Sequence, residues 1–114
     1  MVVDSEERAN RLFHALSDAT RRDIVRQAAR SNHSVSALAR MYPMSFAAVQ
    51  KHVVVLEQAG LIVKERHGRE QRVRTDISAL RNAHVLLDEL AAMWRERLDR
   101  FGDVLAESSK GAKS

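Results

Sequence analysis

The segment from Met44 to Ile62 constrains the fold most, because it carries the signals for the start, the buried side and the end of one short helix. Pro43 ends the preceding helix, and the Ser45 hydroxyl two residues later can cap a new helix N-terminus. Apolar residues then recur at the three-to-four spacing of a helix with one buried face, at Val49, Val53 and Leu56. Gly60 supplies the left-handed residue that commonly ends a helix. The segment therefore predicts a helix over residues 45–59.

The opposite side of this helix is suited to the edges of DNA bases. Its first turns carry Ser45, Phe46, Ala47, Gln50 and Lys51. A glutamine amide can form paired hydrogen bonds to adenine, a lysine can reach guanine or a phosphate, and a serine hydroxyl can bond to either kind of group. Phe46 allows two interpretations, contact with a thymine methyl group or packing back onto the core. The segment thus predicts a helix that lies in the major groove of DNA.

Composition limits the classes of protein that fit. The 114 residues predict a single domain, and an apolar fraction of 45% excludes a disordered chain. A net charge of +4 permits a polyanionic partner without requiring one. The absence of cysteine excludes disulfides, zinc–thiolate sites and cysteine nucleophiles, and we expect no cofactor. The sequence has no apolar stretch of membrane-spanning length and no signal peptide, so we expect a cytoplasmic protein without a membrane partner.

Three more helices are expected before this segment, because apolar residues recur there at helical spacing. They cover residues 6–16, 19–30 and 37–42. Ser17 is the expected cap of the second helix and Ser36 that of the third, with Val35 as a one-residue bridge of extended chain. The third helix, the short turn at Pro43 and the helix at 45–59 together predict a helix-turn-helix unit.

After Gly60 the apolar period changes from helical to alternating, which predicts a β-hairpin over residues 62–75 with its turn at 67–70. Positive side chains gather on this hairpin, at Arg66, Arg69, Arg72 and Arg74. Such a cluster can hold the phosphate backbone or enter the minor groove. A helix-turn-helix followed by a charged hairpin predicts a winged helix-turn-helix domain, mainly α with a small β-hairpin.

The last expected helix covers residues 79–107, capped by Ser78, and would be roughly 40 Å long at 1.5 Å per residue. Its apolar side chains repeat in sevens, in one row of Leu80, Leu87, Trp94 and Phe101 and a second row of His84, Ala91, Leu98 and Leu105. A stripe of this length requires a partner, which we expect to be the same helix of a second copy together with the first helix. Residues 108–114 are small and polar, and we expect a disordered tail after a single domain over 1–107.

The N- and C-terminal helices are therefore expected to form a dimer interface, made by Leu12, Leu80, His84, Leu87, Ala91, Trp94, Leu98 and Phe101. A dimer places its two copies of the helix at 45–59 about one turn of the DNA double helix apart. The preferred double-stranded DNA site should then be an inverted repeat.

Several phrases of the chain resemble the ArsR family of small winged-helix repressors. Residues 13–25 are similar to the family phrase ALSDPTRRxIL, and residues 34–39 to xVxELA. Residues 44–61 match MSxxAVxKHLxVLExAGL at nearly every defined position, and Gly68-Arg69 matches the wing tip. The resemblance covers about residues 9–105, and it implies a homodimeric DNA-binding transcriptional regulator, most often a repressor.

The family pattern also implies roles for single residues. Residues matching Ser45, Phe46, Ala47, Gln50 and Lys51 face the bases, whereas those matching His52 and the wing arginines lie near the phosphates. Arg21 and Arg22 are expected to be structural and to pair with carboxylates. Metal sensing is not carried over, because cysteines are absent and the spacing of Asp76, His84, Asp88 and Glu89 does not match a metal-binding set. Phe46 and Gln50 replace the commoner Gln and Ser, which changes the expected base preference.

Two other function classes remain as alternatives. A winged-helix protein-interaction module without sequence-specific DNA binding is favoured by Phe46 and Ala47 on the DNA-reading helix. An enzyme is not expected, because no acid–base pair, nucleophile triad or phosphate loop is recognisable. A small apolar effector near Met93 and Trp94, or protonation of His84, are hypotheses that rest on position alone, so the effector is unknown.

Overall fold

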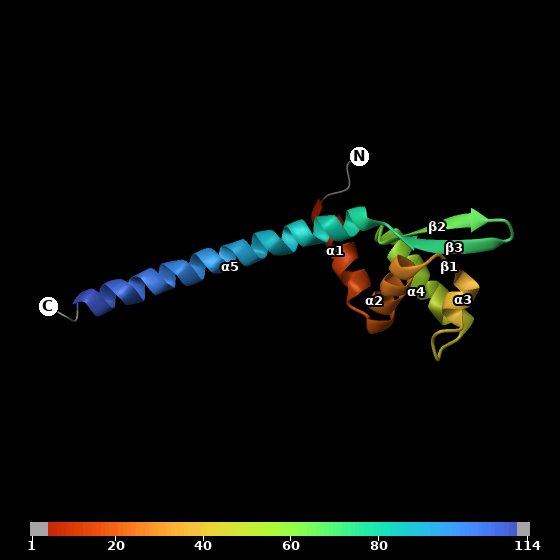
Figure 1. Ribbon diagram of the computed structural model, residues 1–114, viewed down its shortest axis with the longest axis horizontal. Helices are drawn as coiled ribbons and strands as arrows, with labels where there is room; N and C mark the ends of the chain where they lie inside the picture. The colour runs from red at the N-terminus through yellow and green to blue at the C-terminus, as the bar shows by residue number, and fades with distance from the viewer. Residues whose placement is uncertain (1–4, 112–114) are drawn as a thin grey trace. The chain divides into compact units, whose positions relative to one another are not determined.

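The computed structural model describes residues 5–111, which contain five helices and a three-stranded sheet (Figure 1). In chain order the elements are α1 (Ser5–Leu16), α2 (Ala19–Arg30), β1 (His33–Ser34), α3 (Val35–Ala39), α4 (Phe46–Gln58), β2 (Ile62–His67), β3 (Glu70–Thr75) and α5 (Ile77–Gly111). The chain divides into two compact units, the first ending at Ala83 and the second beginning at His84. The predicted winged helix-turn-helix fold is confirmed for the first unit.

The helix α4 is one residue shorter at each end than the predicted 45–59, with Ser45 and Ala59 as its caps. The Ser45 hydroxyl accepts a hydrogen bond from the Ala48 N–H at 3.1 Å and caps the N-terminus. At the other end Gly60 has φ +76°, and its N–H donates to the Glu57 carbonyl at 3.0 Å. The Leu61 N–H donates to the Leu56 carbonyl, also at 3.0 Å, which completes a Schellman motif.

The cap of α2 differs from the prediction. Asp18, not Ser17, is the N-cap, and its carboxylate accepts a hydrogen bond from the Arg21 N–H at 3.0 Å. This bond lowers the pKa of the Asp18 carboxyl below its usual value. Ser17 instead closes the preceding helix, because its hydroxyl donates to the His14 carbonyl at 2.6 Å.

The third helix also begins earlier than predicted. It covers Val35–Ala39 instead of 37–42, and its cap is Ser34, whose hydroxyl accepts from the Ala37 N–H at 3.0 Å. The extended segment predicted at Val35 instead comprises the two preceding residues, the strand β1 at His33–Ser34. The backbone of β1 pairs with β3, and since this pairing ends at Ser34, the buried Val35 already belongs to the helix.

The last helix is longer than predicted at both ends. It begins at Ile77, and the cap side chain is Asp76, which accepts from the Ser78 N–H at 3.0 Å, instead of Ser78. This bond lowers the pKa of the Asp76 carboxyl. The helix continues to Gly111, through part of the stretch expected to be a disordered tail, and residues 112–114 lie outside the described residues.

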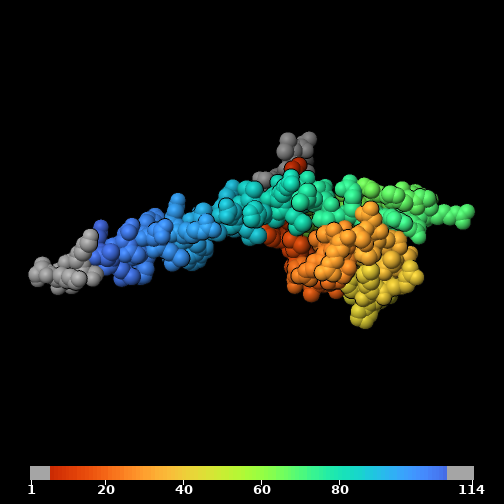
Figure 2. All heavy atoms as spheres, in the orientation of Figure 1, coloured from red at the N-terminus to blue at the C-terminus, as the bar shows by residue number. Residues whose placement is uncertain are grey.

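The sheet has the strand order β1-β3-β2, and both pairings are antiparallel. Ile62 faces Thr75 and His67 faces Glu70, which leaves Gly68 and Arg69 as a two-residue turn. Gly68 has φ +66°, while no non-glycine residue among those described has a positive φ, as expected of a type II′ turn. Figure 2 shows the tip of this hairpin, in light green, extending past the helices of the first unit.

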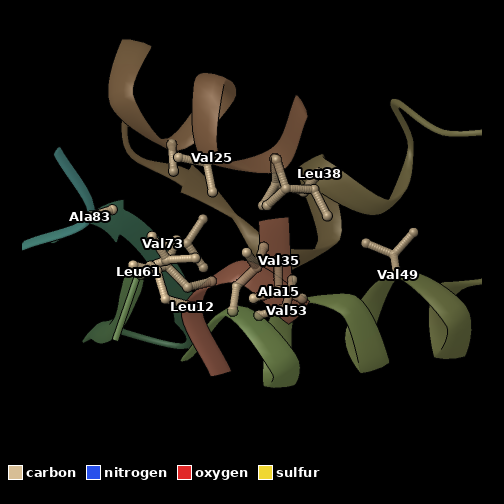
Figure 3. Packing of buried hydrophobic residues seen from close by; sticks show 14 residues of the cluster. Leu12, Ala15, Val25, Val35, Leu38, Val49, Val53, Leu61, Val73 and Ala83 are labelled. Atoms are coloured by element: carbon tan, nitrogen blue, oxygen red, sulfur yellow. The ribbon is translucent and has the colours of Figure 1, made fainter. Parts of the chain in front are cut away.

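The core of the first unit is built entirely from apolar side chains, and among the described residues no polar or charged one is buried (Figure 3). Its largest fully buried members are Ile24, Leu38, Val49, Val53, Leu56, Leu61, Ile62 and Val73. Leu12 is only 5% exposed and belongs to this cluster. The sequence predicts Leu12 as a dimer contact, but the structure places it inside its own unit, where little of it remains for a partner. Leu80 likewise packs against the core and is half-buried.

Candidate nucleic-acid interface

The helix-turn-helix is anchored to the rest of the first unit on both sides of its turn. Leu38 of α3 and Val49 of α4 are fully buried. Between them, the Tyr42 hydroxyl donates to the Asp23 carboxylate on α2 at 2.7 Å. Burial, and secondly this bond to Asp23, raises the pKa of the Tyr42 phenol. Sequence reasoning missed this anchor, since its two residues are far apart in the chain and no local pattern links them.

The residues predicted to face DNA bases lie together on the exposed side of α4. Ser45, Phe46, Ala47, Gln50 and Lys51 are all exposed, whereas the buried stripe of the same helix faces the core. Phe46 is 49% exposed, so its ring does not fold back into the core. Within the described residues no hydrogen bond or ion pair engages the side chain of Gln50 or Lys51. These two long polar side chains are therefore available to an external partner.

Arg21 and Arg22 have partners other than the predicted carboxylates. Arg21 donates from Nε to the Ala15 carbonyl at 2.7 Å and from Nη2 to the His14 carbonyl at 2.9 Å. Arg22 donates from Nη1 to the Leu16 carbonyl at 2.7 Å. Both guanidinium groups thus satisfy carbonyls at the C-terminus of α1, where a cation is also favoured by the helix dipole.

The structure also places Arg21 beside His52 of α4. Arg21 Nη1 lies 3.3 Å from His52 Nδ1, and the imidazole is half-buried. The two residues are 31 positions apart, so no local sequence pattern predicts this contact.

The wing arginines do not share one environment. Arg74 donates from Nε to Glu65 at 2.6 Å across the hairpin, and Arg72 Nη2 lies 3.4 Å from Glu70. The bond from Arg74 lowers the pKa of the Glu65 carboxyl, and the same bond raises the pKa of Arg74. The charge of these two arginines is thus partly compensated by carboxylates of the same hairpin.

Two wing arginines have no carboxylate partner in the described part of the chain. Arg66 donates from Nε to the Gly68 carbonyl at 3.2 Å, which folds its side chain along the turn. Arg69 occupies the second turn position, is exposed, and makes no hydrogen bond or ion pair with residues 5–111. The positive cluster therefore contains fewer free charges than predicted. Only Arg66 and Arg69, at the tip of the hairpin, have a charge that no carboxylate of the described residues offsets.

The second unit consists of α5 from His84 onward, and it carries a continuous apolar stripe. Leu87, Trp94 and Phe101 are 52%, 61% and 62% exposed, and Leu98 is 60% exposed. His84 is also exposed, and Ala91 is half-buried. The Arg97 guanidinium carbon lies 5.5 Å from the centre of the Trp94 ring, in the range of a cation–π contact. Monomeric proteins rarely leave such a row of large apolar side chains in water.

Metal-binding clusters and membrane-spanning helices are both absent from the described part of the chain. No group of three histidines and carboxylates comes together there as it would around a metal ion. None of the helices in residues 5–111 combines the length and apolar character needed to cross a bilayer.

Comparison with known proteins identifies relatives that regulate transcription. No family model matches the chain. The HTH-type transcriptional regulator Rv2034 of Mycobacterium tuberculosis is 31% identical over 96 residues, covering 84% of this chain and 87% of that protein. The solved structure of an ArsR-like transcriptional regulator from Rhodococcus sp. RHA1 is 34% identical and superposes with a TM-score of 0.82, covering 95% of this chain and 98% of the other.

A more distant neighbour supports the fold alone. It is the homodimeric winged helix-turn-helix DNA-binding domain of Mb0332 from Mycobacterium bovis, a possible ArsR-family regulator, at 22% identity and a TM-score of 0.63. The superposition covers 81% of this chain and 91% of that domain.

Proposed function

Because this chain belongs to the ArsR family of winged helix-turn-helix transcriptional regulators, we propose that it is a homodimeric, sequence-specific DNA-binding protein that acts as a repressor at an inverted-repeat operator. The observation that carries the proposal is the pair of unpartnered side chains, Gln50 and Lys51, on the exposed side of α4. Buried apolar residues hold that helix from behind, so the two side chains project from a fixed support.

The N-terminal half of α4 would supply the base contacts. Gln50 has the amide geometry for an adenine edge, and Lys51 reaches a guanine or a phosphate. The Ser45 hydroxyl accepts the Ala48 N–H, which leaves its own proton free to donate to DNA. The N-terminal dipole of the helix adds a favourable field for a phosphate at this point.

The wing would contact the backbone beside the major groove. Arg69 and Arg66 are the members best suited to this role, because no carboxylate in the described chain compensates them. Arg72 keeps part of its charge available, since its contact with Glu70 is long and exposed. We therefore rank Arg69 and Arg66 above Arg72 as phosphate ligands.

Dimerisation would proceed through the apolar stripe of α5. A second copy offers the same stripe, and two such helices can pack their rows of seven-residue spacing against each other. A two-fold dimer then presents two α4 helices, which is why an inverted repeat is the expected site. We further propose that the protein has no enzymatic activity and works in the cytoplasm, alongside chromosomal DNA.

The main test is binding to a selected operator in a gel-shift series at several salt concentrations. Replacing Lys51 by Ala should weaken binding by about 1–3 kcal/mol. It should also lower the slope of log affinity against log salt by about 1 if the ammonium group binds a phosphate. Replacing Gln50 by Ala should relax the base preference and leave the salt slope unchanged.

The matched control is Arg30→Ala, which removes the same charge from the exposed C-terminal end of α2. It should change affinity far less than Lys51→Ala. If operator and scrambled DNA compete equally for the unmodified protein, sequence-specific regulation is wrong, and a protein-interaction module becomes the better explanation.

A second prediction concerns Phe46, whose exposed ring could contact a thymine methyl group. Replacing the operator thymines one at a time by deoxyuridine removes only that methyl group. At one position this replacement should lower the affinity of the unmodified protein about fourfold. That factor corresponds to about 0.8 kcal/mol, the contribution of one buried methyl-sized group. Phe46→Ser should be insensitive to the same replacement, whereas Lys51→Ala should remain sensitive. Equal losses in both variants would exclude Phe46 as the contact.

A further inference from the structure

The guanidinium group of Arg21 connects three elements of the first unit. Its Nε and Nη2 donate to the Ala15 and His14 carbonyls at the end of α1, and its own backbone N–H donates to Asp18 at the start of α2. Its Nη1 is left to face His52 Nδ1 on α4 at 3.3 Å. The two carbonyl bonds fix the guanidinium, so His52 meets a donor whose position is already determined.

This contact constrains the imidazole, because an arginine side chain carries only donors and stays protonated. A hydrogen bond from Arg21 requires a lone pair on His52 Nδ1. The ring is then neutral, and its single proton lies on Nε2. Protonation of the ring would place a second N–H against the guanidinium and would remove the bond.

The free nitrogen of His52 is available to an external acceptor. No partner for Nε2 exists within the described residues, and that atom is not among their buried, unsatisfied polar atoms. His52 follows Lys51 directly and lies seven residues after Ser45, so it shares a side of α4 with the capped N-terminus. That side borders the exposed side chains of Gln50 and Lys51, and a helix in the major groove meets the phosphates of one strand along such a border.

We propose that Arg21 is a positioning residue for DNA binding, because it holds His52 as the neutral Nε2–H tautomer and so directs an N–H donor at a backbone phosphate. The inference rests on the proposed function, since it assumes that α4 lies in the groove. The charged groups that face the imidazole are the Arg21 guanidinium and the Asp18 carboxylate. Asp18 accepts a hydrogen bond from the Arg21 N–H, and within the described residues no hydrogen bond joins Asp18 to the imidazole, so Arg21 is the partner of Nδ1.

A double-mutant cycle tests whether Arg21 acts through His52. His52→Ala should weaken binding about tenfold, to operator and scrambled DNA alike, because a hydrogen bond to a charged acceptor contributes this much and carries no sequence information. Arg21→Met should weaken binding about twofold in the unmodified background, because a mixture of the two tautomers leaves about half of the rings with the donor on Nε2. It should have almost no effect in the His52→Ala background. A loss of equal size in both backgrounds would show that Arg21 is merely structural.

The matched control for Arg21 is Arg22→Met. Arg22 also caps the end of α1, through the Leu16 carbonyl, and has no histidine partner. Nitrogen-15 spectra of the His52 ring should show one tautomer, protonated on Nε2, in the unmodified protein and in Arg22→Met. Arg21→Met should show a mixture of both tautomers. A mixture in the unmodified protein would overturn the proposal.

Variants of His52 itself keep the proposal testable if Arg21→Met fails to fold. A glutamine places an amide N–H near the position of Nε2, while the shorter asparagine reaches only the position of Nδ1. His52→Gln should therefore retain most of the affinity, and His52→Asn should lose as much as His52→Ala. Equal affinities of the two amide variants would contradict the assignment of the donor to Nε2.

The salt slope separates a neutral donor from a charged one. His52→Ala should leave the slope of log affinity against log salt unchanged, because a neutral imidazole releases no counterion. A fall of about 1 in that slope would show that a protonated His52 makes the contact and would overturn the tautomer assignment. If the unmodified protein does not distinguish operator from scrambled DNA, the proposed function fails instead, and this is visible in the same titrations.

Discussion

Replacing both Leu87 and Leu98 by glutamate is expected to convert the proposed dimer into a monomer and to lower operator affinity by at least about a hundredfold. The two side chains lie in the apolar stripe of α5 and are 52% and 60% exposed in the single chain. In a dimer, the two introduced carboxylates would be buried between the two α5 helices without partners, which is unfavourable. A monomer also loses the second DNA-reading head, whose effective local concentration adds two or more orders of magnitude to affinity.

Analytical ultracentrifugation and gel shift measure the two effects together. Ala92→Glu with Ala106→Glu is the matched control, because it adds the same two charges outside the seven-residue rows on exposed positions of the same helix. This control should remain a dimer and bind DNA. A Leu87→Glu, Leu98→Glu variant that still sediments as a dimer would show that the interface lies elsewhere.

The second large effect is expected in the core. Leu56 is fully buried behind the exposed face of α4, so Leu56→Ala leaves a cavity and should lower the free energy of unfolding by about 2–5 kcal/mol. That is a large part of the roughly 5–15 kcal/mol that stabilises a typical domain. Urea unfolding followed by circular dichroism measures the change.

Gln58→Ala, two residues further along α4, is the control for helix propensity and should stay within about 0.5 kcal/mol, because Gln58 is exposed. If Leu56→Ala unfolds at the same urea concentration as the unmodified protein, Leu56 does not carry the packing that the structure assigns to it.

The sequence predicts α4 almost to the residue because all its signals are local. The cap, the apolar spacing and the terminal glycine lie within one segment, and each depends only on near neighbours. The fold class follows from the order of such segments. The exposed side of α4, with Gln50 and Lys51, can be predicted for the same reason.

The N-cap residues of α2 and α3 are predicted less accurately than the bounds of α4, because two neighbouring residues can each cap the helix. Asp18 caps α2 in place of Ser17 because Ser17 bonds to the preceding helix. Ser34 caps α3 in place of Ser36 because strand pairing, a long-range contact, ends at Ser34. Neither competition can be decided from the segment alone.

Contacts between distant segments are not predictable from local patterns. The wing ion pair between Glu65 and Arg74 depends on the strand register, and the contact of Arg21 with His52 depends on how α2 packs against α4. Leu12 shows the related ambiguity of an apolar stripe, which has the same pattern whether its own core or a partner covers it.

The buried and the exposed face of α4 have separate roles, so residues on the exposed face can be replaced without disturbing the packing of the buried face. Val49 and Val53 hold the helix in place, while Gln50 and Lys51 contribute nothing to the core. Substitutions at the second pair therefore carry little risk of unfolding. A change at Gln50 or Lys51 therefore leaves the core intact, so the chemistry of this exposed surface can be altered while the fold stays the same.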